Sequence, residues 1–405
     1  MAKLAGNAIV AQAGGPTVVI NQTLVGIVEA AEDRPEIEVV LGARHGMEGI
    51  LGESFLDLGR QSRQTLEAVA ATPGAALGST RKRPTEAQCL QMFEVMRRHG
   101  VHYFFYIGGN DTAEAVKIVN DVARGAGYPL RCFHVPKTID NDLLVTDHCP
   151  GYGSAGRFVA LAFAGDNLDN RSLPGIKVNV VMGRHAGFLT AAAALARQRE
   201  EDGPHLIYVP ERPVTRERIR DEVAAVHERL GWCVVAVCEG VEDEAAGEGV
   251  TFLETIRQDL EVSEYRSKQL SGSGTLGDWL VGYLKEQMGT GMRMRADTLG
   301  YLQRSFPGVV SETDAQEARE CGRRAVQFAT TGDLDGSVVM RCNREGGRYT
   351  VSYEHAPLEA VAAGTKEMPG EFLAPSGSDI TPAFLDYVRP LVGPLPVMAY
   401  LEDLR

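Results

Sequence analysis

Apolar runs typical of β-strands alternate with helical patterns along most of this 405-residue chain. The expected strands lie at 8–11, 38–42, 103–107, 132–135, 176–181, 206–209 and 233–238. The expected helices lie at about 21–32, 87–99, 112–125, 158–164, 186–200 and 215–230. Because strands that alternate with helices pair in parallel through right-handed crossovers, this order predicts an α/β protein with doubly wound parallel sheets.

The length predicts two such sheets, since one hydrophobic core rarely fills a chain of this size. A break between them is expected near the proline- and glycine-containing segment 149–153. The last hundred residues show a less regular pattern, so their elements are left open.

The charge balance excludes one class of partner. The net charge is −13, from 41 basic and 54 acidic residues, which argues against nucleic acid. An anionic substrate would need a local cluster of cations against this field. No G-x-x-x-x-G-K-[ST] phosphate loop occurs. Two G-x-G-x-x-G matches, at 151–156 and 272–277, do not follow an apolar strand, so neither predicts a nucleotide site.

Cysteine usage and hydropathy indicate the compartment. Seven cysteines without a C-x-x-C pair fit a reducing cytosol, and no H-E-x-x-H suggests zinc. The most apolar stretch, 189–196, is too short to span a bilayer. The chain runs from Met1 directly into the expected strand 8–11, which reads as the start of a fold and not as a signal peptide. We therefore expect a cytoplasmic protein with no membrane partner.

Two loops combine charged and small residues directly after apolar strands. One is Gly108–Thr112 and the other is Pro136–Asp142. In open α/β sheets, ligands bind just beyond the carboxyl ends of the strands. Carboxylates there can hold a metal ion or accept a proton, and glycines let a phosphate approach the backbone. Simple turn chemistry is the alternative for Asp140 and Asp142, but the density of charge favours phosphoryl transfer.

Further candidate residues recur at other expected strand ends. Gly14 and Gly15 form a turn before a helix, where their amides could face a phosphate aided by the helix dipole, or could simply make a tight turn. Arg81, Lys82 and Arg83 form a basic run that is either solvated or an anion site. The remaining candidates are Arg184, Glu239, Arg295, Tyr301 and Arg304. Their recurrence at strand ends makes a functional reading stronger than for any one of them alone.

The motifs and their order along the chain resemble those of the 6-phosphofructokinases, specifically the branch that uses pyrophosphate. The resemblance extends from Ala8 to about Arg304. The resemblance implies two Rossmann-like domains with the active site in the cleft between them. Residues 1–150 with about 303–360 would bind the phosphoryl donor, and residues 151–302 with about 361–405 would bind the sugar phosphate. The implied reaction is reversible transfer of phosphate from pyrophosphate to the 1-hydroxyl of fructose 6-phosphate, with Mg²⁺ as cofactor, in glycolysis or gluconeogenesis.

The resemblance also assigns roles. Asp140 would be the general base, with Lys137, Asp111 and Arg184 as further catalytic residues. Substrate would also contact Thr138, Ile139, Met182, Gly183, Glu239, Arg295, Tyr301, Leu302, Gln303 and Arg304. Diphosphate would contact Gly14, Gly15, Arg81 and Lys82, and the metal would contact Asn110 and Asp142. Many family members have aspartate at the place of Asn110, and an amide oxygen is a weaker ligand.

Two positions bear on the choice of donor. By the same resemblance, members that use ATP usually have glycine where this chain has Asp111 and Lys137. The Asp111 carboxylate would repel the α-phosphate of ATP, and Lys137 would supply a cation to the departing phosphate. Arg295 matches a residue that the family supplies from a neighbouring subunit, which implies a homodimer or homotetramer with shared sites. The alternatives are an ATP-dependent enzyme, sedoheptulose 7-phosphate as acceptor, and a non-catalytic regulatory subunit.

Overall fold

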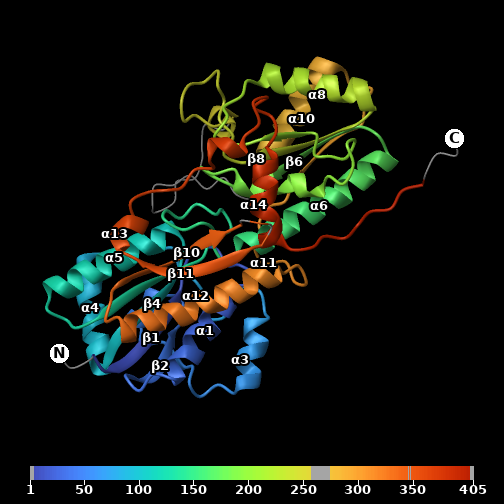
Figure 1. Cartoon of the computed structure of the whole chain (residues 1–405). Helices are drawn as coiled ribbons and strands as arrows, with labels where there is room; N and C mark the ends of the chain where they lie inside the picture. Colours follow the sequence, from blue (N-terminus) through green and yellow to red (C-terminus); the bar gives the residue numbers. More distant parts are fainter. Residues whose placement is uncertain (1–3, 257–273, 345, 347, 402–405) are drawn as a thin grey trace. The chain divides into compact units, whose positions relative to one another are not determined.

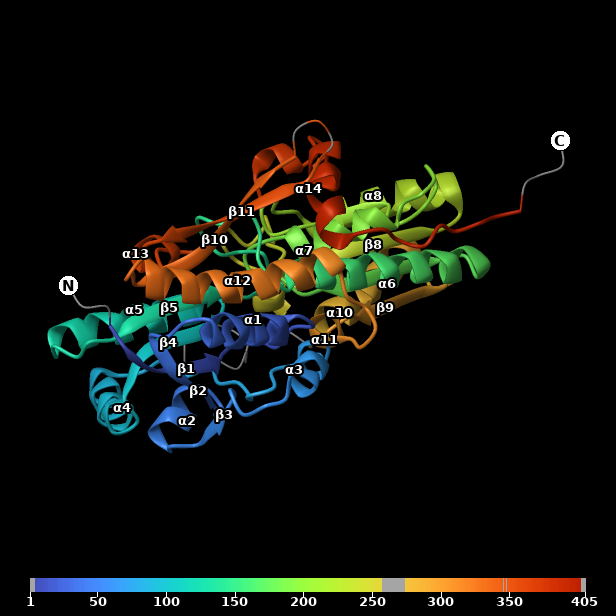
Figure 2. The same cartoon turned by 60° about the horizontal axis from the view of Figure 1, so that its bottom comes forward.

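The computed structural model of this chain describes residues 4–256, 274–344, 346 and 348–401. Within these residues, the chain forms two compact units. The first unit comprises residues up to 155 together with 304–366, and the second comprises 156–256, 274–303 and the residues after 366. Each unit is built around its own β-sheet, as Figures 1 and 2 show.

Among the described residues, the sheet of the first unit has seven strands in the order β11-β10-β5-β4-β1-β2-β3. Their bounds are β1 Gly6–Gln12, β2 Ile37–Ala43, β3 Phe55–Asp57, β4 Val101–Gly108, β5 Arg131–Pro136, β10 Gly336–Asn343 and β11 Thr350–Ala356. The five central strands are parallel, whereas β3 and β11 pair antiparallel at the two edges. The parallel strands bring the loops that follow β1, β4 and β5 to one edge of the sheet.

Helices cover both faces of this sheet. Its helices are α1 Ile20–Glu32, α2 Met47–Leu51, α3 Arg63–Ala70, α4 Glu86–Arg98, α5 Asn110–Gly125, α12 Glu312–Thr331 and α13 Leu358–Val361. One apolar core joins α1, α3 and α12 to the sheet, and a second joins α2, α4 and α5 to the opposite face (Figure 2). Because both faces are covered, the central strand β4 reads as a nearly continuous apolar run and not as an alternating one.

The second unit has a four-stranded parallel sheet, counted over the described residues, in the order β7-β8-β6-β9. The strands are β6 Ile176–Val181, β7 Leu206–Tyr208, β8 Cys233–Cys238 and β9 Met294–Thr298. The helical segments are α6 Tyr152–Ser172, α7 Phe188–Ala191, η1 Ala192–Ala196, α8 Arg216–Leu230, α9 Phe252–Ile256, α10 Thr275–Met288, α11 Leu302–Ser305, η3 Gly370–Phe372 and α14 Pro382–Val392. Helices α8, α9 and α10 share one apolar core with the sheet, and α7 packs against β7 and β8.

The expected parallel α/β architecture is confirmed, with differences in detail. In place of the helix expected at 186–200, the chain forms the short helix α7 followed by the 3₁₀ helix η1. This alanine-rich segment is buried, and the backbone becomes extended at Arg197. Helix α6 is longer than expected and runs from residue 152 to 172. The hairpin β10–β11 extends the first sheet from the irregular last hundred residues. No helix within the described ranges is both long and apolar enough to cross a bilayer.

Candidate active site

Lys137 lies where three strand-end loops of the first unit meet. Its side chain is almost completely buried, and its Nζ donates a hydrogen bond to the carbonyl of Gly15 at 2.7 Å. Its backbone N–H donates to the carbonyl of Gly108 at 3.0 Å. The loops after β1, β4 and β5 therefore converge on one ammonium group, as the order of the parallel strands predicts.

Two arginines join Lys137 at this place. A Cβ built on Gly15 would lie 3.1 Å from the guanidinium of Arg304, so that side chain packs closely against the glycine turn. Burial, together with the nearby charges of Arg304 and Arg81, lowers the pKa of Lys137 to about 8 against the opposing pull of Asp140. Clustered cations around a glycine turn form a site that is poised for a polyanion.

The glycine turn after β1 precedes a helix, as expected. The amide of Gly14 donates to the carbonyl of Thr80 at 2.9 Å, and α1 begins at Ile20, close to the expected residue 21. The Gly14 amide thus takes part in a tight turn, and a role of this turn in binding phosphate stays a prediction. Helix α5, which begins at Asn110 immediately after Gly109, directs its N-terminus to the edge of the sheet that carries the converging loops.

The loop after β5 carries the predicted acidic residues. The hydroxyl of Thr138 accepts a hydrogen bond from the amide of Asp140 at 3.1 Å, and the Ile139 side chain is buried. The Nδ2 group of Asn110 donates to Oδ2 of Asp142 at 2.7 Å. The structure thus brings the two predicted metal ligands, one from the start of α5 and one from this loop, into contact.

Two oxygen atoms at this contact fit a hard cation. Oδ1 of Asn110 and Oδ1 of Asp142 are both buried, and neither has a hydrogen-bond partner in the part of the chain that the structure describes. Burial, followed by the charge of Asp140, raises the pKa of Asp142 above its ordinary range. Buried oxygens of this kind carry a desolvation cost that a divalent cation would offset.

The sequence did not reveal how the charges near α5 are paired. Arg83 donates to the carboxylate of Asp111 at 2.6 Å and also pairs with Glu114 one turn along α5. Lys82, expected to bind diphosphate, lies 2.8 Å from the Glu48 carboxylate. Within the basic run, the charge of Arg81 acts on Lys137. An Arg–Asp contact between residues 28 positions apart leaves no local signal in the sequence.

The first glycine motif is occupied by a structural contact. The carboxylate of Asp314 accepts hydrogen bonds from the amides of Gly151 and Ser154 at 2.8 and 2.9 Å, at the start of α6. Two amides at this motif are therefore engaged by a carboxylate of the chain itself. Of the second motif, Gly274 is the N-cap of α10, and Gly272 lies outside the described residues.

In the second unit, the loops after β6 and β8 pack tightly together. The amide of Glu239 donates to the carbonyl of Val181 at 2.9 Å, and the thiol of Cys238 donates to the carbonyl of Gly183 at 3.2 Å. A Cβ on Gly240 would come within 1.9 Å of the carbonyl of Arg184. The structure therefore brings Arg184, with Met182 and Gly183, next to the buried Glu239, as predicted from their strand-end positions.

The other sugar-phosphate candidates of this unit differ in exposure. Tyr301 and Leu302 are exposed, and Arg295 lies on β9. Gln303 is fully buried, where it donates to the carbonyl of Gly300 at 2.8 Å and accepts from the amide of Met182 at 3.4 Å. Its amide group is used to hold this unit together, which fits a supporting role.

Comparison with known proteins agrees with these features. A family model described as phosphofructokinase matches residues 7–329. The chain is 50% identical over 388 residues to the pyrophosphate–fructose 6-phosphate 1-phosphotransferase of Rhodospirillum rubrum, covering 96% of this chain and 94% of that protein. It is 37% identical to the protein of the same name from Xanthomonas campestris, covering 98% and 94%. The crystal structure of a pyrophosphate-dependent phosphofructokinase from Nitrosospira multiformis superimposes with a TM-score of 0.85 at 32% identity, covering 98% and 95% of the two chains.

Proposed function

The chain belongs to the phosphofructokinase family, and we propose that it transfers a phosphoryl group from pyrophosphate to fructose 6-phosphate. The products are fructose 1,6-bisphosphate and orthophosphate. The anhydride bond of pyrophosphate is broken and a phosphate ester is formed on the sugar, with orthophosphate as the only by-product. The reaction is therefore close to reversible, and it can serve glycolysis or gluconeogenesis.

The observation that carries this proposal is the buried Lys137 ammonium between the glycine turn and the acidic loop. A cation in this place stabilises the phosphate that leaves when pyrophosphate is split. The Asp111 carboxylate at the start of α5 disfavours a donor that must extend a further phosphate past it. Both features, together with the two relatives whose names specify pyrophosphate, support this donor over ATP.

We further propose Mg²⁺ as the metal. The unpartnered Oδ1 atoms of Asn110 and Asp142 would hold it, with the remaining positions left for water and the diphosphate. When bound, the ion neutralises part of the negative charge that separates during transfer. The aspartate common in the family at the place of Asn110 is therefore not essential to the proposal.

The residues of the chain carry the other steps. Asp140 accepts the proton of the 1-hydroxyl as that oxygen attacks phosphorus. Arg184 neutralises charge on the transferred group, while Lys137 and Arg304 neutralise charge on the leaving phosphate. Catalysis in this scheme is positioning and charge stabilisation with a single proton transfer. Arg304 was expected at the 6-phosphate, and its position over Gly15 supports a contact on the donor side as well.

The sugar phosphate is assigned to the residues that the family resemblance indicates. Glu239 would accept hydrogen bonds from sugar hydroxyls, and Tyr301 would contact the 6-phosphate. Thr138, Ile139, Met182, Gly183, Leu302 and Gln303 would complete the acceptor site or support it. Gly14, Gly15, Arg81 and Lys82 would contact the diphosphate.

One assay tests the proposed function directly. Purified protein is given pyrophosphate or ATP with fructose 6-phosphate or sedoheptulose 7-phosphate, and bisphosphate formation is measured for each pair. We expect pyrophosphate with fructose 6-phosphate to give the highest kcat/KM. A preference for ATP would assign the chain to the ATP-dependent enzymes, and a preference for the seven-carbon acceptor would change the substrate. No turnover with any pair would favour a regulatory subunit.

The charge of Lys137 predicts a pH dependence. Because burial lowers its pKa to about 8, the free enzyme loses this cation as the pH rises through that value. We expect kcat/KM for pyrophosphate to fall with increasing pH above about 8, because the leaving phosphate loses its charged partner. Lys137→Arg keeps the charge at every pH tested, so its profile should lack this limb. Identical limbs in both proteins would assign the titration to another group.

If the active site is shared between subunits, two inactive variants should complement each other when their subunits are mixed. We propose a cytoplasmic homodimer or homotetramer in which Arg295 reaches the site of a neighbouring subunit. Arg295→Ala and Asp140→Asn proteins should each be nearly inactive, and mixing them with subunit exchange should restore part of the activity. Exchange is followed with differently tagged subunits. Proven exchange without any recovery would show that each site is built from one chain.

A further inference from the structure

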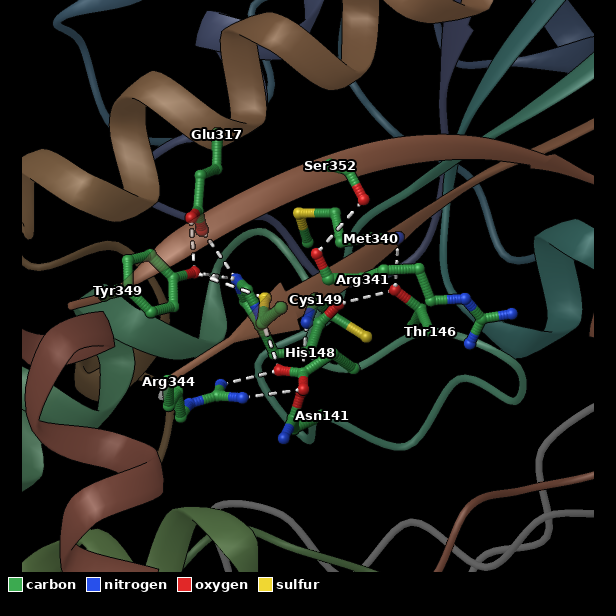
Figure 3. Close-up of polar contacts among 12 residues, drawn as sticks. Asn141, Thr146, His148, Cys149, Glu317, Met340, Arg341, Arg344, Tyr349 and Ser352 are labelled. Atoms are coloured by element: carbon green, nitrogen blue, oxygen red, sulfur yellow. Dashed lines mark hydrogen bonds and ion pairs between the residues drawn. The ribbon is translucent and has the colours of Figure 1, made fainter. Parts of the chain in front are cut away.

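A group of polar and charged side chains surrounds the buried His148 and Glu317, at the end of the loop that carries Asp140 and Asp142. We call it the His148 cluster; its members are Asp147, His148, Glu317, Cys342, Arg344 and Tyr349 (Figure 3). The loop supplies the first two, α12 supplies Glu317, and β10 with the segment after it supplies the others. All six belong to the first unit. None of them has a role in the proposed reaction.

The ring of His148 is a charged group held between two carboxylates. Its Nε2 lies 2.6 Å from Glu317 and its Nδ1 lies 3.0 Å from Asp147, while the residue is 1% exposed. Since carboxylates only accept hydrogen bonds, both ring nitrogens must donate, which requires imidazolium. Burial alone would lower the pKa of His148, but the bonds to Asp147, Cys342 and Glu317 outweigh it and raise this pKa.

The surrounding side chains complete the charge balance of the cluster. Arg344 donates to both oxygens of Asp147 at 2.7 and 2.8 Å. The hydroxyl of Tyr349 donates to Glu317 at 2.5 Å. Two carboxylates are thus matched by one imidazolium and one guanidinium, so the cluster carries no net charge.

Backbone contacts link this cluster to the two aspartates. Asn141, which stands between Asp140 and Asp142, accepts a hydrogen bond at its side-chain oxygen from the amide of Cys149 at 3.0 Å. Thr146 donates its hydroxyl to the carbonyl of His148 at 2.9 Å (Figure 3). Any displacement of His148 and Cys149 is therefore transmitted to the residue between the two acidic groups.

The loop also adopts a backbone conformation that it would not hold alone. Asn141 has φ 61° and Val145 has φ 70°. Left-handed geometry is unfavourable for a β-branched residue such as valine and persists where surrounding contacts determine it. The contacts at 141 and 146–149 are of this kind.

We propose that His148 is a positioning residue for phosphoryl transfer: its charged ring fastens the end of the loop to α12, and thereby holds Asp140 and Asp142 in their working geometry. The role rests on the proposed function, since those two residues are its base and metal ligand. A metal site built from Asp147, His148 and Cys342 is the competing reading, because their donor atoms lie within 4.8 Å of one another. Arg344 already engages both oxygens of Asp147, which favours the ion network.

The test compares His148→Gln with Val326→Ala, a variant in the buried core of the same helix that carries Glu317. Val326→Ala removes apolar packing without touching the cluster, so it controls for lost stability. We expect His148→Gln to lower kcat at least about tenfold with KM for both substrates within about twofold, because small misplacements of catalytic groups cost up to about 10²-fold. Val326→Ala should keep the parental kcat.

Hydrogen exchange gives a readout that does not depend on activity. In His148→Gln, amide exchange should accelerate in residues 138–149 and not across the unit. A kcat within twofold of the parent, a general rise in exchange, or an equal loss of kcat in Val326→Ala would overturn the proposal. Stoichiometric zinc in the purified parent that is lost from His148→Gln would also overturn it.

A variant that does not fold and a parent that is inactive lead to different conclusions. If His148→Gln does not fold, Tyr349→Phe removes only the hydroxyl that holds Glu317, and the same loop-specific exchange with a smaller loss of kcat is expected. Unchanged exchange and kcat in that variant would count against the proposal. If the parent is inactive with pyrophosphate and ATP, the proposed function fails, while exchange in the loop still decides whether His148 anchors it.

Discussion

Replacing Asp140 with asparagine is expected to lower kcat with pyrophosphate by about 10²–10⁴, because a positioned general base typically contributes that much. Asparagine has nearly the same shape and can still accept the hydrogen bonds of the loop, but it cannot take the proton of the 1-hydroxyl. The amide of Asp140 is held by Thr138, so the backbone should keep its place. Binding of fructose 6-phosphate, measured by calorimetry, should therefore change little.

Asp333→Asn is a matched control at the other end of the same parallel strands. Asp333 precedes β10 and pairs with Arg131 at the start of β5, at the amino ends of the parallel strands. Asp333→Asn removes one carboxylate from the first unit without approaching the candidate site, and its kcat should equal that of the parent. If Asp140→Asn keeps kcat within about tenfold of the parent, below the range for a general base, another group accepts the proton.

Among the described residues, the parallel strands other than β9 and β10 could be predicted because their signal is local. Each is an apolar run bounded by glycine or charge, and a parallel sheet buried on both faces requires such runs. Edge strand β11 alternates between exposed and partly buried residues, and its pairing with β10 depends on contacts across a turn. The length of helix α7 was overestimated, because alanine favours helix locally whereas tertiary packing of this buried segment decides where the helix ends.

The candidate site also combines features with a local sequence signal and features that depend on long-range contacts. Residues at strand ends were predictable, since the order of parallel strands alone brings the loops after β1, β4 and β5 together. The pairing of Arg83 with Asp111, the position of Arg304 over Gly15 and the His148 cluster were not, because each joins segments distant in the sequence. Interpretation of Asp111 changes as a result. Its carboxylate is partly neutralised by Arg83, so charge repulsion against ATP is weaker than for an isolated carboxylate.

Donor preference is expected to respond in opposite directions to changes at Lys137 and Asp111. Lys137→Met removes the buried cation that we propose faces the leaving phosphate, and kcat/KM for pyrophosphate should fall by about 10²–10³, as for other lost charge-stabilising donors. Methionine fills similar space, so packing is largely kept. Lys117→Met, which removes an exposed lysine paired with Asp121 on α5, is the matched control and should leave kcat/KM unchanged.

Asp111→Gly removes the carboxylate and keeps the ion pair between Arg83 and Glu114. An isolated carboxylate about 4 Å from a phosphate would cost on the order of 4 kcal/mol at an effective dielectric near 20. Since Arg83 offsets part of this, we expect kcat/KM for ATP to rise by at least about tenfold, or about 1.4 kcal/mol. Glu114→Ala also removes one partner of Arg83 but keeps Asp111, so it should not admit ATP. Equal gains in both variants would assign the discrimination to Arg83, and a parent that already prefers ATP would refute pyrophosphate as the donor.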